Sequence, residues 1–225
     1  SMWRKDWVEK YVVVVPIFII VVLVLVVKFF GYAGKVNKRV ATSGEKRTLG
    51  NEMLFAFHLI FHPFDGFWDL KHEKRGSLRA ALVYLAITIA AFVYSGVGQS
   101  FLYQPTKSFG NIFLQISAVA LPILLWTVAN WCLTTLFEGE GSLKDIFIAT
   151  CYAAVPLPLL TIPSVLLTHV LTLNEQGFIS LINGIMWVWI GLLIFFGCMV
   201  THDYTIGKNT VTCLATIVGM CLIMF

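Results

Sequence analysis

Long runs of apolar residues, separated by short polar segments, dominate the hydropathy pattern of this chain. Each run reaches or nearly reaches the roughly 20 residues that a helix needs to cross a bilayer core of about 30 Å. No small-residue cleavage site follows the first run, which is longer than the apolar region of a signal peptide, so we expect that run to be retained. The pattern predicts six spanning helices, at about residues 11–30, 79–102, 112–137, 145–172, 179–200 and 209–225.

A shorter periodic segment lies between the first two spans, in EMLFAFHLIFHPFDGFWDLKHEKRGS. Helical spacing separates its residues into an apolar stripe with aromatic anchors and a polar stripe, which is typical of a helix lying in the membrane interface. Pro63 divides this helix, and His62 is the expected N-cap of its second half. The apolar stripe contains Met53, Leu54, Phe57, Ile60, Phe61, Phe64, Phe67 and Trp68. The polar stripe contains His58, His62, Asp65, Asp69 and His72.

Three prolines interrupt the apolar run CYAAVPLPLLTIPSVLL, residues 151–167. A proline inside a helix removes one backbone hydrogen bond, and in hydrocarbon no water can replace that bond. We therefore expect this span to be kinked or unwound, with the released carbonyls facing neighbouring helices such as the one that bears Asn130. A cavity at the break is the alternative to a simply bent packing helix. The bent helix is favoured because membrane helices tolerate proline.

Composition identifies the class of protein, and the positions of the charges predict its orientation. The chain is 58% hydrophobic and 12% charged, whereas soluble domains have about 25% charged residues. Six spans divide the 16 Lys and Arg residues into twelve on one side and four on the other. The positive-inside rule places the richer side in the cytoplasm and both termini outside. The alternative is five spans, with a first helix that is poorly integrated or packs peripherally. This alternative leaves the orientation of the other spans unchanged.

Candidate catalytic and metal-binding chemistry is sparse. Three histidines and two aspartates on the polar stripe have helical spacings that suit zinc, but Pro63 breaks the helix that would align them, so we favour the wet face of an interfacial helix. The five cysteines form no C-x-x-C pair and are expected to be small buried hydrophobes. No H-E-x-x-H, phosphate-binding glycine loop or G-x-S-x-G motif occurs. We predict a protein without enzymatic activity, cofactor or metal, whose basic loop faces lipid headgroups and not nucleic acid.

Polar residues near the ends of the spans are the remaining candidates. Asn130 lies near the cytoplasmic end of the third span, where an interhelical hydrogen bond is its expected role. No Asp, Glu, Lys or Arg lies at the centre of a span, which argues against an ion-coupled transporter. Glu138 and Glu140 alternate with glycines in the turn FEGEGSLKD, where Ser142 precedes Asp145 as in a capping box.

The next cytoplasmic turn, THDYTIGK, contains His202 and Tyr204. Since both turns lie on the cytoplasmic side, we expect them to meet the interfacial helix in one polar cluster.

Three segments together resemble the Yip1 domain family in its bacterial form: HPFDGFWDLKHEKRGSLRAA, ANWCLTTLFEGEGSLKDIFIATCYAAVPLPLL and MVTHDYTIGKNTVTCLATIVGM. The resemblance runs from about residue 62 to the end. Family patterns match Tyr152 with Pro156, the acidic glycine turn 138–141, and His202 with Tyr204. The sequence AAVPLPLL after the tyrosine and the extra N-terminal helix depart from the family pattern.

The resemblance implies an all-α, polytopic membrane helix bundle. We expect a five-helix Yip1-like core, to which an N-terminal transmembrane helix and an interfacial amphipathic helix are added. The corresponding division is an N-terminal transmembrane helix at 1–34, a cytoplasmic basic loop with the interfacial helix at 35–78, and the five-span bundle at 79–225.

Two functions are consistent with this architecture. The favoured one is a non-enzymatic scaffold or accessory protein of a bacterial cytoplasmic membrane, in contact with lipids and with another membrane protein such as an ABC-type transporter. The alternative is a conduit or lipid-handling protein with its site around the proline-broken span. The candidate functional or structural residues are Asn130, Glu138, Glu140, Tyr152, Pro156, His202 and Tyr204.

The charge distribution generates a prediction about topology. A cysteine placed at Ser43 should be protected from a membrane-impermeant thiol reagent in intact cells, whereas one at Ser108 should be labelled. Labelling at Ser43 from outside would contradict the twelve-to-four assignment.

Overall fold

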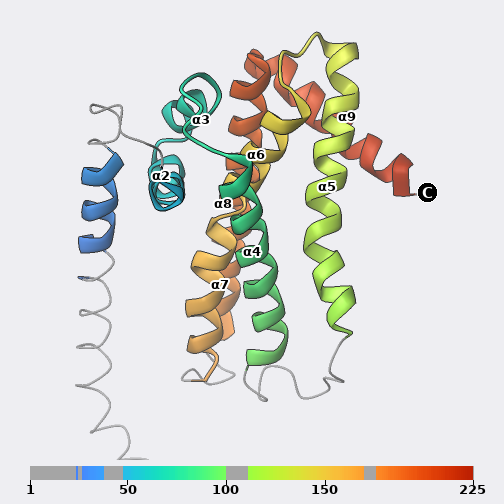
Figure 1. The fold of residues 1–225 in the computed structure, drawn as a ribbon. Coiled ribbons are helices and arrows are strands. Elements are labelled where there is room, and N and C mark those ends of the chain that lie inside the picture. The colour runs from blue at the N-terminus through green and yellow to red at the C-terminus, as the bar shows by residue number, and fades with distance from the viewer. Residues whose placement is uncertain (1–23, 25–26, 38–47, 100–110, 170–175, 225) are drawn as a thin grey trace, which may run out of the picture.

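The computed structural model describes residues 24, 27–37, 48–99, 111–169 and 176–224, and the regular elements in these ranges are helices (Figure 1). The expected first span, residues 11–30, lies largely outside the described residues. Two helices, α2 and α3, precede a bundle formed by the other six. They are α2 (Leu49–Phe61), α3 (Pro63–His72), α4 (Leu78–Gly98), α5 (Ile112–Phe137), α6 (Leu143–Ala153), α7 (Pro156–Leu167), α8 (Gln176–His202) and α9 (Ile206–Met224).

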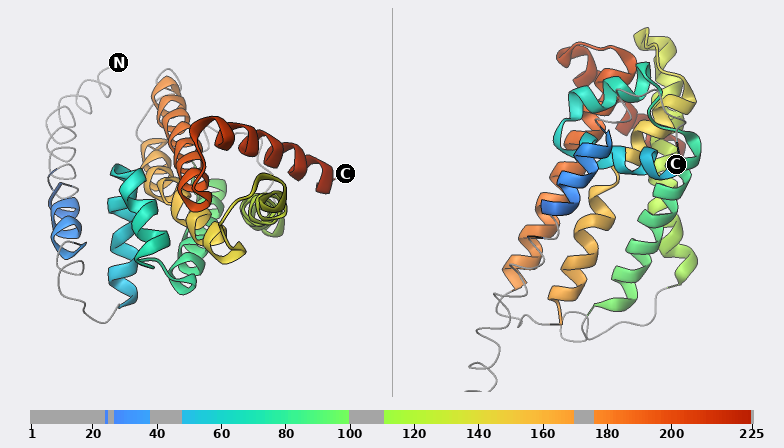
Figure 2. Two further views of the ribbon diagram at one scale, coloured as in Figure 1. Left: turned by 90° about the horizontal axis from the view of Figure 1, so that it is seen from above. Right: turned by 60° about the vertical axis from the view of Figure 1, so that its left-hand side comes forward.

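The five expected spans after the first are confirmed. Five helical stretches in the described chain are long and apolar enough to cross a membrane: α4, α5 to Thr134, α6 with α7, α8, and α9. The helices α4, α5, α7 and α8 run side by side, whereas α9 leaves the bundle obliquely and packs on α5 (Figures 1 and 2). The fourth span differs from its expected form because it consists of two helices, α6 and α7, and not one.

The span made of α6 and α7 lies at the centre of the bundle. In its most apolar window 78% of the residues are buried, against 17–28% in the other four spans. Its α6 half packs against α4, α5 and α8, and its α7 half packs against α4 and α8. The remaining spans keep large apolar side chains on their outer faces, as helices do when lipid surrounds them. The proline-rich segment is therefore the most enclosed of the five.

The prolines break the central span at Ala154 and Val155, as expected, and at Pro156 and Pro158 the released carbonyls accept local backbone hydrogen bonds instead of bonds from neighbouring helices. Pro156 and Pro158 have no N–H, so the carbonyls of Tyr152 and Ala154 lose their usual helical donors. The N–H of Val155 donates to Tyr152 at 3.3 Å, and the N–H of Leu157 donates to Ala154 at 3.0 Å. These bonds span three residues, as in a 3₁₀ turn. They satisfy the carbonyls locally, and the Asn130 side chain bonds elsewhere.

The helices α2 and α3 cover one side and one end of the bundle, and we call them the cap (Figures 1 and 2). Their division at Pro63 is confirmed. His62 stands at the N-cap position of α3 but makes no side-chain capping bond, so its expected capping role is wrong; Pro63 supplies the preset backbone of a first helical position. Phe55 and Phe67 are buried against the bundle, while the other aromatic residues of the amphipathic stripe are exposed or half-buried: Phe57, Phe61, Phe64 and Trp68.

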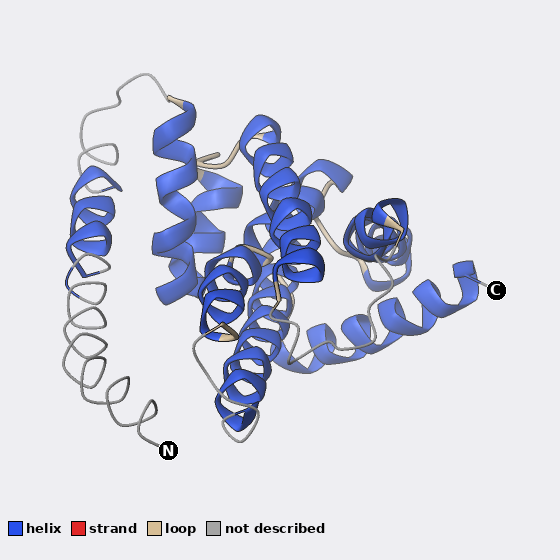
Figure 3. Cartoon of the chain, turned by 90° about the horizontal axis from the view of Figure 1, so that it is seen from below, coloured by secondary structure: helices blue, strands red, loops and turns tan. Residues whose placement is uncertain are grey.

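The helical segment 27–37 lies beside α2 (Figure 3). Phe30 packs edge-on against Phe57 and Phe61, with ring centroids 5.6 and 5.0 Å apart. Asn37 donates from Nδ2 to the carbonyl of Leu54 at 3.2 Å. The described part of the N-terminal helix therefore contacts the cap.

The break generates a prediction about Pro156. Pro156→Ala restores one backbone hydrogen bond, worth about 1 kcal/mol, but favours a straighter helix in the most buried span. Misplaced core packing costs more than that, about 2–5 kcal/mol for large defects. We expect Pro156→Ala to lower the melting temperature in detergent. Pro158 is also buried, so it does not face lipid and cannot serve as the control. The matched control is Pro163, which is exposed. A larger loss in Pro163→Ala would contradict the proposed role of Pro156.

Candidate functional site

The acidic glycine turn after α5 and the H-x-Y turn after α8, which contain predicted site residues, meet at one end of the bundle. His202 is the last residue of α8 and is 2% exposed. Its Nδ1 accepts a hydrogen bond from the N–H of Gly141 at 3.3 Å. Its Nε2 lies 2.6 Å from Oδ1 of Asn130. One imidazole thus joins α8, α5 and the glycine-rich turn.

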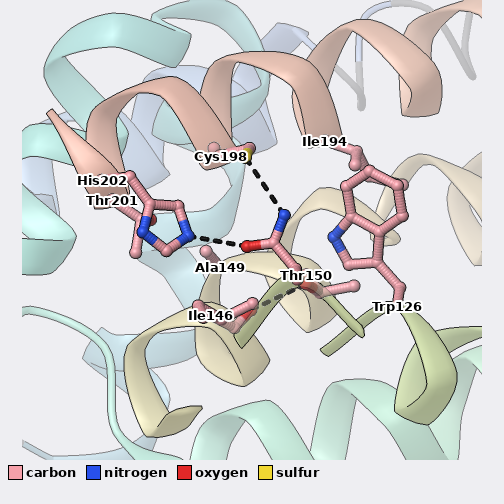
Figure 4. Close-up of a pocket in the computed structure, with 10 residues that line it drawn as sticks. Trp126, Ile146, Ala149, Thr150, Ile194, Cys198, Thr201 and His202 are labelled. Atoms are coloured by element: carbon pink, nitrogen blue, oxygen red, sulfur yellow. Dashed lines mark hydrogen bonds between the residues drawn. The ribbon is translucent and has the colours of Figure 1, made fainter. Parts of the chain in front are cut away.

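Asn130 is fully buried and uses both ends of its amide. Figure 4 draws its bonds to Cys198 and His202 as the dashed lines that start at those two labelled residues. Its Nδ2 donates to Thr216 Oγ1 at 3.2 Å and to Cys198 Sγ at 3.4 Å. Since Oδ1 can only accept, the proton between Asn130 and His202 belongs to Nε2 of the imidazole, which leaves Nδ1 free to accept from Gly141. His202 is therefore a neutral imidazole here, with both nitrogens paired. The expected interhelical hydrogen bond of Asn130 is present and links α5, α8 and α9.

The alternating glycines of the acidic turn allow this close approach. A Cβ atom added to Gly139 would lie 2.6 Å from His202 Nδ1, and one added to Gly141 would lie 2.8 Å from His202 Cε1. Both distances are too short for real side chains, so any larger residue would push the turn away from the imidazole. The E-G-E-G pattern thus reflects contact with the H-x-Y turn.

The two glutamates of this turn have different roles. Glu138 ends α5 in the left-handed region, with φ of 49°, and its side chain is exposed. Glu140 pairs with Lys71 of α3 at 3.2 Å. The Glu140 side chain is 69% exposed, so the pair contributes only about 0–1 kcal/mol. Next in the chain, Ser142 and Asp145 form the expected capping box at the start of α6, with both reciprocal bonds present.

Tyr204 completes this end of the bundle. Its ring stacks on His202, with centroids 5.1 Å apart, and Lys208 Nζ lies 5.0 Å from the same ring. The phenol is buried, and burial raises the pKa of Tyr204. Within the described part of the chain its hydroxyl has no hydrogen-bond partner. The two turns and the cap meet in one polar cluster, as expected, through Lys71, Glu140, Gly141 and His202.

Tyr152 and Pro156 do not belong to this cluster. Tyr152 is fully buried on α6, and its hydroxyl donates to the carbonyl of Glu52 in α2 at 3.1 Å. The neighbouring ring of Tyr84, 5.2 Å away, belongs to α4, and its hydroxyl bonds to the carbonyl of Met53. The side chain of Glu52 bonds to Ser77, the N-cap of α4. Two tyrosines from the bundle therefore attach the first turn of α2.

The histidine and aspartate residues of the cap do not assemble a metal centre. His58 stacks on His62, and Asp69 pairs with Arg75 at 3.6 Å. Burial raises the pKa of Asp69 while Arg75 opposes that shift. Among the residues described, no three His, Cys, Asp or Glu side chains are placed to hold one ion.

Two cavities lie next to this region. A small one, about 10 Å³, is bordered by Asn130, His202, Thr150 and Trp126 (Figure 4) and has room for about one water molecule. A larger one, about 290 Å³, lies between α4, α5, α8 and the break in the central span. Its walls are mostly apolar and include Ala118, Ala154 and Leu157. Trp126, Thr150 and Ile194 border both.

The model of the Yip1 domain matches residues 57–225 of this chain. The match covers the cap from the middle of α2 and all five described spans. The chain belongs to the Yip1 domain family. No curated protein and no solved structure matches it.

Membership of the Yip1 family agrees with the resemblance seen in the sequence, whose expected start at about residue 62 was five residues late. The protein is therefore a multi-pass membrane protein of the Yip1 type. In this Yip1 protein the family's acidic glycine turn and its H-x-Y turn are one structural unit, joined by Gly141 and His202.

Several residues of the site are absent from the sequence-based predictions. Glu52, Ser77 and Tyr84 were not identified, although a tyrosine inside an apolar span is a signal that a buried hydroxyl needs a partner. Cys198 is buried as expected, but it also accepts a hydrogen bond from Asn130. Cys132 and Cys221 are exposed on the outer faces of their helices and not buried.

The network around Asn130 generates a prediction. Asn130→Ala removes the acceptor of the His202 Nε2–H, which is then left buried and unpaired, and one donor to Thr216, whose hydroxyl keeps its bond to the carbonyl of Thr212. Unsatisfied buried polar groups cost about 1–3 kcal/mol, so we expect a clear loss of thermal stability in detergent. Val128→Ala, at an exposed position of the same helix, is the control and should change the melting temperature little. Equal effects would show that the network does not stabilise the bundle.

The pKa of His58 generates a prediction about acid sensitivity. Burial, and secondly the nearby His62, lower the pKa of His58 below 6.5. The unfolded chain therefore binds the proton more readily than the folded one, and stability should fall as the pH drops from 6.5 to the folded-state pKa. His58→Gln should weaken this dependence, whereas the exposed His72→Gln should retain it. Thermal unfolding at pH 7.5, 6.5 and 5.5 measures the difference, and an unchanged profile in His58→Gln would contradict it.

Proposed function

We propose that this Yip1 protein is a non-enzymatic scaffold or accessory protein of a bacterial cytoplasmic membrane. The observation that supports this role is the use of the buried polar groups. Asn130, His202, Tyr84 and Tyr152 bond between helices, or between the bundle and the cap. Groups held by such bonds stabilise one arrangement of helices, as a structural scaffold requires.

The partners of such a scaffold are membrane lipids and another integral membrane protein, for which an ABC-type transporter is our candidate; nucleic acid is not among them. Exposed aromatic side chains on the cap, such as Phe64 and Trp68, suit the boundary between headgroups and hydrocarbon. The outer faces of α8 and α9 also carry exposed apolar side chains over much of their length, as helices in contact with lipid or another span do.

A lipid-handling role is the second candidate, and the larger cavity favours it. The cavity of about 290 Å³ lies at the break in the central span, close to the lower end of the range of small-molecule sites, about 300–1,000 Å³. Its mostly apolar walls suit part of an acyl chain and not an ion or a polar solute. A conduit for polar solutes is accordingly less well supported than a lipid site.

Affinity purification of the full chain in mild detergent, with mass spectrometry of co-purifying proteins and lipids, tests both roles. A membrane protein recovered in stoichiometric amount, and absent with a tagged multi-pass control, would support the scaffold. A stoichiometric lipid without a protein partner would support lipid handling.

A variant that fills the larger cavity tests whether a bound lipid occupies that cavity. Ala118 borders the large cavity, and its side chain is exposed. Ala118→Phe should remove a bound lipid without disturbing the core, whereas Ala90→Phe, at an exposed position of α4 that does not border the cavity, should not. Retention of the lipid in Ala118→Phe would contradict a site at the break.

A further inference from the structure

A third cavity is bordered by residues of α3, α4 and α6. Helix α3 and the first turns of α4 and α6 lie at the end of the bundle that carries the cap (Figure 1). Its volume is about 390 Å³. Three lysines from three segments border it: Lys71 at the end of α3, Lys74 in the connection to α4, and Lys144 at the start of α6. The sequence offered no sign of this grouping, since 70 residues separate Lys74 from Lys144.

The cavity is electropositive, although two carboxylates offset part of its charge. Asp145 borders it, but both the N–H and the hydroxyl of Ser142 donate to its Oδ2, at 3.4 and 2.5 Å. Glu140 pairs with Lys71 and is largely exposed to solvent. The ammonium groups of Lys74 and Lys144 add to the partial positive charge at the N-terminal ends of α4 and α6, which begin at this cavity.

The walls beside the lysines are apolar. Phe67, Leu78 and Ile148 border the same space, and Leu78 opens the first membrane-spanning helix of the bundle and is 41% exposed. A soluble anion needs only the charged part of such a site. A phospholipid uses both parts, because it carries its phosphate directly next to its glycerol–acyl region.

We propose that this cavity binds the phosphate group of an anionic phospholipid headgroup, with Lys71, Lys74 and Lys144 as the cationic contacts. The cavity exceeds the lower limit of about 300 Å³ for small-molecule sites. Basic pockets on the cytoplasmic side of membrane helices recognise anionic headgroups through the same chemistry. Lys71, which pairs with Glu140, borders the same cavity and adds a third positive charge.

This proposal does not depend on the scaffold role or on the larger cavity. The lysines bind a headgroup at the end of the bundle, whereas the apolar cavity lies at the break in the central span. The effects of Ala118→Phe and of the lysine variants are therefore separable.

The test uses the full chain, purified in detergent and examined by native mass spectrometry with added phosphatidylglycerol or phosphatidylcholine. The variant is the double substitution Lys74→Gln with Lys144→Gln, which removes two charges and keeps side-chain length. The matched control is Lys28→Gln with Lys35→Gln, which removes two exposed lysines of segment 27–37. Thermal unfolding confirms that each variant is folded.

We expect the wild-type protein to retain phosphatidylglycerol in preference to phosphatidylcholine. A lysine near an anionic membrane surface contributes about fivefold in affinity, so the double variant should lose on the order of tenfold or more, while the control loses less than about twofold. Equal losses in both variants, or unchanged binding in the double variant, would overturn the proposal.

A second arm distinguishes a lipid from a soluble phosphate. Glycerol 3-phosphate, added at millimolar concentration, should not displace phosphatidylglycerol, because it lacks the acyl region that the apolar walls contact. Displacement that depends on Lys74 and Lys144 would overturn the lipid assignment and identify a soluble phosphate ester as the ligand.

Discussion

Backbone carbonyls in the middle of a membrane protein must find donors within the protein, since hydrocarbon offers none. The requirement is hardest to satisfy in the central span of this chain, because Pro156 and Pro158 remove two backbone N–H donors from a buried segment. The N–H groups of Val155 and Leu157 replace them through three-residue turns. The replacement is local, so the break needs no polar residue from a neighbouring helix. Asn130 is therefore available for a different contact.

The break also divides the span into two helices with different surroundings. On α6, Tyr152 bonds to α2, while Ala149 and Thr150 border the small cavity beside Asn130 and His202. On α7, Leu157 borders the larger apolar cavity. One end of the protein is thus closed by hydrogen bonds between the turns, the cap and the bundle. The middle of the bundle keeps an apolar space of about 290 Å³ beside the break.

Three cavities follow one another through this Yip1 protein. The basic cavity and the small one share Thr201, and the small one shares Trp126, Thr150 and Ile194 with the apolar cavity. The paired side chains of Asn130 and His202 lie between the two larger spaces. A bound phospholipid would contact the lysines and the lipid-facing surface of α4, and a protein partner would contact other surfaces. Anionic lipid at one site and a scaffold role are therefore compatible.

Local sequence patterns were sufficient for the elements of this fold. Runs of about 20 apolar residues predicted the five described spans, and amphipathic periodicity with Pro63 predicted the divided cap helix. The Ser142–Asp145 spacing predicted the capping box. These features depend on neighbours within a few residues, whose geometry the helix repeat sets. The E-G-E-G and H-x-Y segments were identified as candidates for the same reason, since unusual polar residues stand out between apolar runs.

Tertiary structure alone decided which distant groups pair. His202 meets Asn130 and Gly141, Tyr152 meets Glu52, and Lys74 shares a cavity with Lys144. None of these partners is close in the chain. Their pairing depends on the rotation of each helix about its axis and on its position along its neighbours. Those quantities come from packing many side chains at once, and no single segment determines them. The local hydrogen bonds to the carbonyls of Tyr152 and Ala154 likewise depend on the backbone geometry at Ala154 and Val155. The positions of the prolines in the sequence do not determine that geometry.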